Sequence, residues 1–452
     1  MQSASATSYL REVEIGHKEN LNRGEHECEE GLGGNENRNP ERENASLFPP
    51  KRPSLRERLQ AEDTHLLGNT ADLTTLFVSE VSGVCITPDS LHEAVRGTGD
   101  VNGLYHLAIS IQHVLDQRYP TPGYRQPTED SSGKPVKEPV PDRRLVQDTM
   151  ERLLVEIGSA LYDRVGGPIL LPIDPRRHNN VGGLVRSAKR MVAMLTAKGI
   201  DKKQVIVSIV ATEDGVKAIQ VLAAARINTN LILVSGLRHA MICVEAGPAA
   251  ISIAVRPLLQ AREKRQKQTF PNLLTHPGIT DILAIIEYFK RHKIATRILG
   301  TDFEELAELA ILSGFDAVFL SAVQLEDVRW RSDPQFPTMA LRKLHEMAVF
   351  RALNGEYPCK VLANIQPGTG GFLRTLSPAT REEIFDTLYP EMYRMQDVMN
   401  AVEAIVYKAL GRQVALRTLS MDALCDLWER KARREEPLGN REKINHDSEE
   451  CL

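Results

Sequence analysis

The feature that most constrains the fold is a regular alternation between short apolar segments and longer segments with helical spacing. The apolar segments are rich in β-branched residues, which is typical of strands buried on both faces of a parallel sheet. A weaker segment of this kind lies at 65–69. The others span 81–87, 168–173, 205–211, 230–234, 250–255, 296–300 and 317–321.

Segments with helical spacing separate these strands, for example 182–197, 215–225 and 279–292. Eight strand–helix units over roughly 300 residues predict an α/β fold of the closed (β/α)8 TIM-barrel type. An open, doubly wound sheet would carry a glycine-rich turn after its first strand, and the sequence has none there. Residues 395–410 also have helical spacing and predict a C-terminal helix that packs across the barrel or mediates dimerisation.

Three segments fall outside this pattern. Residues 1–60 are rich in Glu, Asn, Arg, Ser and Gly, so we expect a disordered N-terminal extension. The proline-rich stretch at 119–141 predicts an exposed insertion, and 433–452 reads as a charged tail. The barrel domain with its C-terminal helices is therefore expected over 61–432.

Composition excludes several classes of protein. The net charge is -4 and no long basic run occurs, which argues against nucleic-acid binding. There is no apolar stretch of membrane-spanning length and no signal-peptide pattern at the N-terminus. The six cysteines are scattered without a CxxC pair, which favours a reducing compartment. We therefore expect a cytoplasmic protein without a membrane partner.

Several motifs, taken in order, resemble transaldolase. No one of them is decisive, but their succession at matching spacing is specific. The resemblance covers about residues 65–330. The motifs are Ser82-Gly-Val-Cys-Ile-Thr-Pro-Asp89, Ile173-Asp-Pro-Arg176, Ile242-Cys-Val-Glu-Ala-Gly247 with the strand at 250–255, His276-Pro-Gly-Ile279, and Thr296-Arg-Ile-Leu-Gly-Thr301.

The resemblance implies an aldol transfer that needs no cofactor. In that family a lysine on the fourth strand forms an imine with the substrate, carboxylates move protons, and arginines hold the phosphate. The lysine position falls on Ser208 here, and a serine has no amine to form the imine.

Other pocket positions also differ from the family pattern. Three positions that hold an aspartate, an asparagine and a glutamate in the family are occupied here by Asn69, Thr87 and Pro172, respectively. The positions of the family's two phosphate-binding arginines are occupied by Pro257, which follows Arg256, and by Glu304. A glutamate in place of an arginine opposes phosphate binding by on the order of 4 kcal/mol at 4 Å. Asn230 and Ser252 match polar pocket residues of the family.

Some residues leave two interpretations open. Asp302 and Glu304 could hold a divalent cation, or they could begin the next helix, where acidic residues are favoured. Glu213 and Asp214 have the same two interpretations. His178 could act as a general base or be a solvated loop residue. Ser208 could be a nucleophile, although spacing identifies no base for it.

The glycine-rich segment Gln366–Gly371 lacks the ending of a phosphate-binding loop and is interpreted as a turn.

The sequence thus predicts a transaldolase-like barrel that has lost Schiff-base chemistry. The favoured hypothesis is a repurposed enzyme for a different, less anionic small molecule, for instance in specialised metabolism. One alternative is a non-catalytic binding or scaffold protein. Another is an active transaldolase of carbohydrate (pentose phosphate) metabolism with displaced residues. A small-molecule ligand is expected, and a homo-oligomer is left open.

Overall fold

The computed structural model describes residues 54–70, 73–97, 102–118, 141–353, 355, 357–365 and 371–418. The chain divides into two compact units. The first comprises the described residues up to Ser90 together with Gly158–Gln396, and it contains the barrel. The second comprises the described residues of Leu91–Ile157 and those from Asp397 onward.

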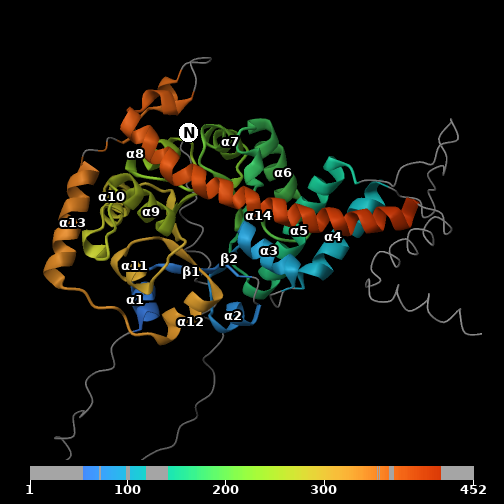
Figure 1. The fold of residues 1–452 in the computed structure, drawn as a ribbon, viewed down its shortest axis with the longest axis horizontal. Helices are drawn as coiled ribbons and strands as arrows, with labels where there is room; N and C mark the ends of the chain where they lie inside the picture. Colours follow the sequence, from blue (N-terminus) through green and yellow to red (C-terminus); the bar gives the residue numbers. More distant parts are fainter. Residues whose placement is uncertain are drawn as a thin grey trace, which may run out of the picture. The chain divides into compact units, whose positions relative to one another are not determined.

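The first unit is a closed barrel in which each of eight strands pairs in parallel with the next and β8 pairs with β1 (Figure 1). This confirms the predicted (β/α)8 fold. The strands are β1 (His65–Gly68), β2 (Gly83–Cys85), β3 (Ile169–Pro172), β4 (Val205–Val210), β5 (Asn228–Ile232), β6 (Ala250–Ala254), β7 (Arg297–Thr301) and β8 (Ala317–Leu320).

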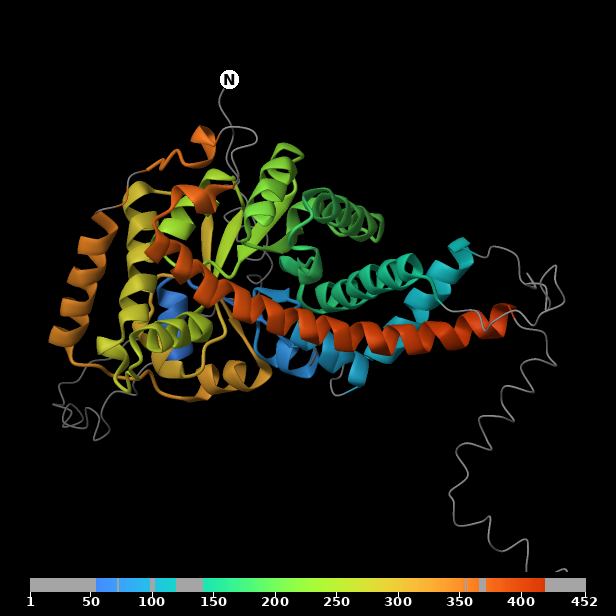
Figure 2. The same ribbon diagram turned by 45° about the horizontal axis from the view of Figure 1, so that its top comes forward.

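In the first unit, helices follow the strands and cover the outside of the barrel (Figures 1 and 2). No helix in the described part of the chain is both long and apolar enough to cross a membrane. The α-helices are α1 (Leu55–Ala61), α2 (Leu73–Val78), α3 (Pro88–Arg96), α4 (Gly103–Arg118), α5 (Arg143–Val165), α6 (Val181–Ala197), α7 (Glu213–Ala224), α8 (Leu237–Glu245), α9 (Val255–Gln266), α10 (Pro277–His292), α11 (Leu306–Ile311), α12 (Ala322–Trp330), α13 (Thr338–Leu353) and α14 (Pro378–Thr418).

Short 3-10 helices complete the connections. They are η4 (Pro175–Arg177), η5 (Lys202–Gln204), η6 (Leu273–Thr275), η7 (Leu362–Asn364) and η8 (Phe372–Thr375).

The barrel interior is filled by side chains from alternate strand residues, as expected for a packed barrel of this size. The core of the barrel is apolar, because the side chains that fill it are aliphatic, aromatic or thiol groups. The buried cluster comprises Leu67, Cys85, Leu170, Ala250, Leu299, Ala317 and Phe319, with Ile206 packed against it. Polar side chains occur nearer the carboxyl ends of the strands.

The predicted strand at 230–234 is displaced by two residues, because the structure has β5 at Asn228–Ile232. The strand ends where Leu233 adopts a φ of 65°, in the left-handed region. That conformation lies outside the extended region and stops the ladder. The displacement leaves Asn230 within the strand, and its Cα partners are Ser208 on β4 and Ala250 on β6.

The predicted disordered extension over 1–60 is too long, because α1 begins at Leu55. Ser54 and Glu57 form a reciprocal capping box, and Leu55 and Leu59 are buried. Two apolar residues four positions apart therefore anchor this short helix on the barrel. Residues 1–53, the predicted insertion at 119–140 and the tail at 433–452 lie outside the described residues.

The second unit is helical. Its buried side chains include Leu107, Ile111 and Leu115 of α4, which recur every four residues. In α5, Arg152 Nε pairs with Glu156 Oε1 at 2.8 Å, one helical turn away. The predicted helix at 395–410 is part of the much longer α14.

Candidate functional site

The carboxyl ends of the eight strands meet at one rim of the barrel, where (β/α)8 proteins place their functional groups. Most of the predicted pocket residues lie on or directly after these strand ends. Pro172, Ser208 and Asn230 stand side by side in register on β3, β4 and β5. Asn69 follows β1, Thr87 follows β2, and Asp302 follows β7.

Ser208, Asn230 and Ser252 form a buried hydrogen-bonded chain across three neighbouring strands. Asn230 Nδ2 donates to Ser208 Oγ at 3.3 Å, and Ser252 Oγ donates to Asn230 Oδ1 at 3.0 Å. All three side chains are at least 95% buried. The chain satisfies both ends of the Asn230 amide, which is the condition for burying such a group without a large cost.

The position that the resemblance assigns to the imine-forming lysine is therefore part of a neutral polar network. None of the eight strands that the structure describes contains a lysine. Pro172, the neighbour of Ser208 on β3, has no side-chain group that can transfer a proton. The nearest polar partner of the Ser208 hydroxyl is an amide, which is not a base.

A second pair of polar residues joins the ends of β1 and β2. Thr87 Oγ1 donates to Asn69 Oδ1 at 3.1 Å, and the Thr87 backbone NH donates to Ser90 Oγ at 2.9 Å. Both Asn69 and Thr87 are half-buried. They present hydroxyl and amide groups, and no charge, to this side of the rim.

Asp302 is the acidic residue whose chemistry is most altered at the rim. It adopts a φ of 55°, and its Oδ2 accepts a hydrogen bond from Thr301 Oγ1 at 2.8 Å. The residue is exposed, but protein atoms surround its carboxyl group closely enough to desolvate it in part. This desolvation raises the pKa of Asp302, while the Thr301 hydrogen bond opposes the rise.

Glu304 forms an ion pair with Arg256, whose Nε lies 3.5 Å from Glu304 Oε2. Both side chains are 53% exposed, so the pair contributes about 1 kcal/mol or less to stability. Its importance is electrostatic, because it neutralises the arginine that lies beside the predicted phosphate position. The backbone NH of Arg256 also donates to the carbonyl oxygen of Asp302 at 3.0 Å.

The structure contradicts one of the two interpretations that the sequence left open for Asp302 and Glu304. They do not begin the next helix, because α11 starts at Leu306 after the N-cap residue Glu305. Within the described ranges, no group of three or more His, Cys, Asp or Glu side chains is arranged to hold a metal ion. A cation held by Asp302 and Glu304 alone stays a prediction.

Arg394 is a rim residue that the sequence did not identify. It lies on α14 and donates to both carboxylate oxygens of Asp89, at 2.8 and 2.9 Å. Its Nη2 is also 2.6 Å from Glu391 Oε1. The hydrogen bond with Asp89 is the main reason that the pKa of Arg394 is raised. An isolated arginine in a long helix has no sequence signal for a partner 305 positions away.

Residues after β3 and β4 have structural partners. Arg176 pairs with Asp174 at 2.7 Å. Burial lowers the pKa of His178, whose carbonyl oxygen accepts from Thr212 Oγ1 at 2.8 Å. Glu213 and Asp214 begin α7, which confirms the helix-start interpretation.

The Glu213 side chain is also a contact for the segment after the glycine-rich run. Its Oε1 accepts from the backbone NH of Leu373 at 2.7 Å. Gly371 is described, but 366–370, the rest of the predicted turn, lie outside the described residues.

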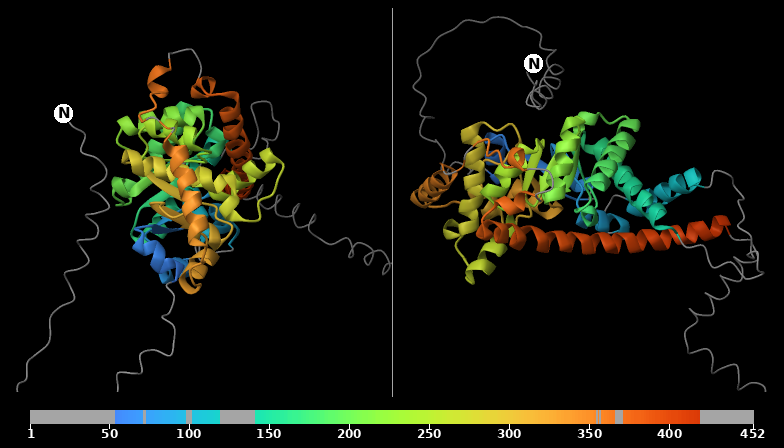
Figure 3. Two further views of the ribbon diagram at one scale, coloured as in Figure 1. Left: turned by 90° about the vertical axis from the view of Figure 1, so that its left-hand side faces the viewer. Right: turned by 90° about the horizontal axis from the view of Figure 1, so that it is seen from above.

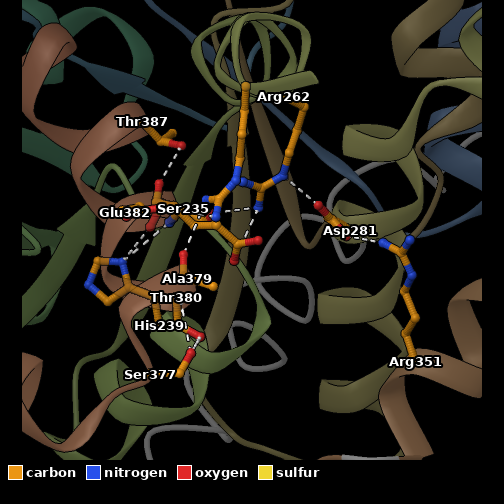
Figure 4. A network of polar contacts seen from close by, with 12 residues as sticks. Ser235, His239, Arg262, Asp281, Arg351, Ser377, Ala379, Thr380, Glu382 and Thr387 are labelled. Atoms are coloured by element: carbon orange, nitrogen blue, oxygen red, sulfur yellow. Dashed lines mark hydrogen bonds and ion pairs between the residues drawn. The ribbon is translucent and has the colours of Figure 1, made fainter. Parts of the chain in front are cut away.

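A separate network, also unpredicted, connects Ser235, which follows β5, with residues of α9, α10 and α13 (Figure 4). Arg262 Nε donates to Asp281 Oδ2 at 2.6 Å, and Arg262 Nη2 donates to the Ser235 carbonyl oxygen at 3.3 Å. Arg351 of α13 pairs with the other oxygen of Asp281. The Arg262 side chain is only 6% exposed, so this network ties α9, α10 and α13 together in a region of low dielectric.

His239 forms the other part of this network. The backbone NH of Ser235 donates to His239 Nδ1 at 3.3 Å, so the proton of the neutral ring lies on Nε2. Nε2 donates to the Ala211 carbonyl oxygen at 2.9 Å. Burial lowers the pKa of His239 to about 4, against the opposing effect of the Ala211 contact. The ring is thus a neutral structural link between the loops after β4 and β5.

Comparison with known proteins agrees with this geometry. Residues 129–354, half of the chain, match the model of the family described as transaldolase/fructose-6-phosphate aldolase. The match takes in β3 through β8, so it includes Ser208, Asn230 and Asp302 but not Asn69 or Thr87.

Individual relatives are similar at low identity. Transaldolase 1 of Pectobacterium atrosepticum is 29% identical over 43% of this chain and 61% of its own length. A transaldolase of Agrobacterium fabrum is 25% identical over 58% of this chain and 84% of its length. One from Synechocystis is 26% identical over 56% of this chain and 65% of its length. The chain thus spans less than two thirds of the first and third of these relatives.

The barrel topology and the match over half of the sequence lead to the same result. The chain belongs to the transaldolase/fructose-6-phosphate aldolase family.

Proposed function

We propose that this protein does not catalyse Schiff-base aldol transfer and instead acts on a small, uncharged or weakly charged hydroxylated molecule at the barrel rim. The observation that carries the proposal is the position of Ser208. Imine formation requires an amine that can lose its proton inside the barrel. The Ser208 hydroxyl is held by Asn230 in a neutral buried chain, and no lysine lies on the described strands.

The charges at the rim support the second part of the proposal. Arg176, Arg256 and Arg394 each pair with a carboxylate of this chain. A phosphate would have to displace one of these carboxylates before it could bind an arginine bidentately. A neutral polyol would not, and hydroxyl and amide groups such as those of Asn69 and Thr87 are suitable partners for it.

For a repurposed enzyme, Asp302 is our candidate for the group that moves a proton. Desolvation raises its pKa, and a carboxyl group with a raised pKa is suited to general acid or base catalysis. Ser208 is not a good nucleophile in this scheme, because its hydrogen-bond partner is an amide and cannot accept the proton.

A non-catalytic binding protein is the second candidate. It is favoured by the Ser208–Asn230–Ser252 chain, whose hydrogen bonds are made within the protein. The names of the relatives favour a third candidate, a working transaldolase with displaced residues. We place the protein in the cytoplasm, a location consistent with the free thiols of Cys85, Cys243 and Cys359.

Borohydride trapping tests the loss of Schiff-base chemistry. The protein is incubated with fructose 6-phosphate and sodium borohydride, and its intact mass is measured, with an active transaldolase as the positive control. We expect no adduct on this protein. An adduct that peptide mapping places on any lysine would overturn the proposal in favour of the third candidate.

A ligand screen then tests the class of substrate. Thermal unfolding is measured with neutral polyols and ketoses, and with the matching sugar phosphates. A rise in melting temperature confined to the neutral compounds supports the proposal. A larger rise with the phosphates would contradict it. Asp302→Asn then separates the first two candidates, because it should abolish turnover in an enzyme while leaving binding of the neutral compound intact.

A further inference from the structure

The first half of α14 is fastened to the barrel at two places. Near its start, Arg265 of α9 donates to the Ala379 carbonyl oxygen at 3.1 Å and lies 3.4 Å from a carboxylate oxygen of Glu382. Farther along, Arg394 pairs with Asp89, which lies in the first turn of α3. Figure 3 shows this half of α14, in orange-red, lying against the barrel. The helix is therefore held by two separate contacts on different elements of the barrel unit.

Two carboxylates hold Arg394 in a fixed orientation. Its Nη1 and Nη2 donate to the two oxygens of Asp89 at 2.8 and 2.9 Å, and its Nε donates to Glu391 Oε1 at 2.7 Å. Nη2 is also 2.6 Å from the same Glu391 oxygen. A planar guanidinium group that a carboxylate engages along each of two edges has little freedom to rotate. Arg394 therefore fixes where the Asp89 carboxylate lies relative to α14.

Asp89 belongs to the turn that carries the predicted pocket residue Thr87. The backbone NH of Thr87 donates to Ser90 Oγ at 2.9 Å, and the backbone NH of Ser90 donates to Thr87 Oγ1 at 3.2 Å. These reciprocal hydrogen bonds close the first turn of α3, as a side chain at a helix N-terminus commonly does. Asp89 lies inside that turn, so a shift of Asp89 would move Thr87 with it.

The turn continues to Asn69, the second polar residue on this side of the rim. Thr87 Oγ1 donates to Asn69 Oδ1 at 3.1 Å, and the backbone NH of Asn69 donates to the Leu320 carbonyl oxygen at 2.8 Å. The Asn69 side chain thus accepts through its oxygen from Thr87. Its amide NH₂ group can donate to a ligand hydroxyl group.

We propose that Arg394 is a positioning residue of the rim site, which through Asp89 holds the Thr87–Asn69 pair in the orientation that binds ligand hydroxyl groups. The ligand-binding role rests on the function proposed above, whereas the coupling from Arg394 to Thr87 does not. Lysine could not take this role equally well, because it carries a point charge and lacks the planar fork that engages both carboxylates.

The electrostatics of Asp302 agree with this placement. Desolvation is the main reason that the pKa of Asp302 is raised, and the charges of Glu391, Arg394 and Asp89 have smaller effects on it. Charges influence one another strongly only over short distances in salt solution. The three residues therefore lie on the same side of the rim as the candidate proton-transfer group.

Hydrogen–deuterium exchange of the full chain, read by mass spectrometry, tests the coupling without any ligand. Arg394→Met should make peptides that contain Thr87 and Ser90 exchange about fivefold faster. Asp89→Asn should have the same effect. The double variant should add little to either single change, because both remove one contact.

Arg265→Met is the matched control. It removes the other contact between α14 and the barrel and leaves the Arg394 pair intact, so the Thr87 and Ser90 peptides should exchange as in the unaltered protein. Unchanged exchange of these peptides in Arg394→Met overturns the inference. So does an equal increase in Arg265→Met, or effects of Arg394→Met and Asp89→Asn that add.

Ligand binding tests the role of the coupling. The probe is D-fructose, and ligand-detected NMR measures its dissociation constant. Arg394→Met should raise that constant about threefold to tenfold, and Arg394→Lys should give an intermediate value. An unchanged constant in Arg394→Met overturns the positioning role. If the unaltered protein does not bind fructose, that result counts against the proposed function, and the exchange data still decide the coupling.

Discussion

The Oγ atom of Ser208 on β4 lies 3.3 Å from Nδ2 of Asn230 on β5, and both side chains are buried inside the barrel. This hydrogen bond occupies the place where the resemblance to transaldolase expects a reactive amine. At this position the structure has a neutral hydrogen bond between two buried side chains. The predictions below start from this contact and from the charged groups around it.

Replacing Asn230 with alanine should destabilise the protein by about 1–3 kcal/mol, because Ser208 and Ser252 each lose a buried hydrogen-bond partner. Urea unfolding measures the difference. Asn228→Ala is the control on the same strand, since Asn228 is only half-buried and donates to the Lys203 carbonyl oxygen near solvent. Equal losses for the two variants would show that the buried chain has no special contribution.

Ser208→Lys should not create a transaldolase. The new ammonium group would be buried among Asn230, Pro172 and apolar side chains, so we expect lower stability and a lysine pKa well below its ordinary value. The acid/base and phosphate positions remain altered. Trapping with fructose 6-phosphate and borohydride should give at most an adduct, without transfer to an aldehyde acceptor. Measurable turnover would mean that the rim still contains a working acid/base pair.

Glu304→Gln should improve binding of phosphate, because it releases Arg256 from its ion pair and removes a negative charge. The expected gain is a few-fold to about tenfold, since both side chains are half exposed to solvent. Titration calorimetry with inorganic phosphate measures it at low salt. Glu346→Gln is the control, as Glu346 forms a surface pair with Arg342 on α13, and both side chains are mostly exposed. No gain over that control would argue against Arg256 as a latent anion ligand.

Arg262→Met should cost about 1.5–3 kcal/mol of stability, because Asp281 and the Ser235 carbonyl oxygen each lose a charged hydrogen-bond donor while Asp281 keeps Arg351 as a partner. Arg265→Met, three residues further along α9, should cost less than about 1 kcal/mol. Arg265 pairs with Glu382 where that carboxylate is 66% exposed. Chemical denaturation of both variants compares them, and equal costs would contradict the network in Figure 4.

His239 should make stability fall as the pH is lowered from about 6.5 toward 4. Its pKa is lowered to about 4 in the folded protein, so between these values the unfolded chain binds a proton that the folded protein does not. The lost stability approaches roughly 3 kcal/mol at the lower limit. His239→Gln keeps a polar side chain without this titration.

The measurement is the free energy of unfolding at pH 7.5 and pH 5 for both proteins. The destabilisation caused by His239→Gln should be smaller at pH 5 than at pH 7.5. A constant difference at the two pH values would exclude His239 as a source of acid sensitivity.

The barrel could be predicted because its signal is local. Strand segments such as 205–211 and helix segments such as 182–197 are identified by spacing within one element, and β4 and α6 were found close to those bounds. The errors came where the backbone leaves the repeating pattern. The left-handed conformation of Leu233 shifted β5, and the capping box at Ser54 lengthened the ordered chain.

The site could be predicted only as a set of positions. Ser208, Asn230 and Ser252 could be named from strand order, but their mutual hydrogen bonds depend on the register between β4, β5 and β6. The sequence identifies Asp302 and Glu304 as acidic residues of the rim. It does not show that Glu304 pairs with Arg256 or that α11 starts after both residues.

By itself, the sequence therefore determined the alternation of strands and helices, the family resemblance and the serine at position 208. The tertiary structure decided which charges meet, such as Arg394 with Asp89 and Arg262 with Asp281. The physical reason is the separation along the chain between the residues that interact. Backbone periodicity is set by neighbours a few residues away, whereas ion pairs and pKa values depend on side chains that only barrel closure and helix packing bring together.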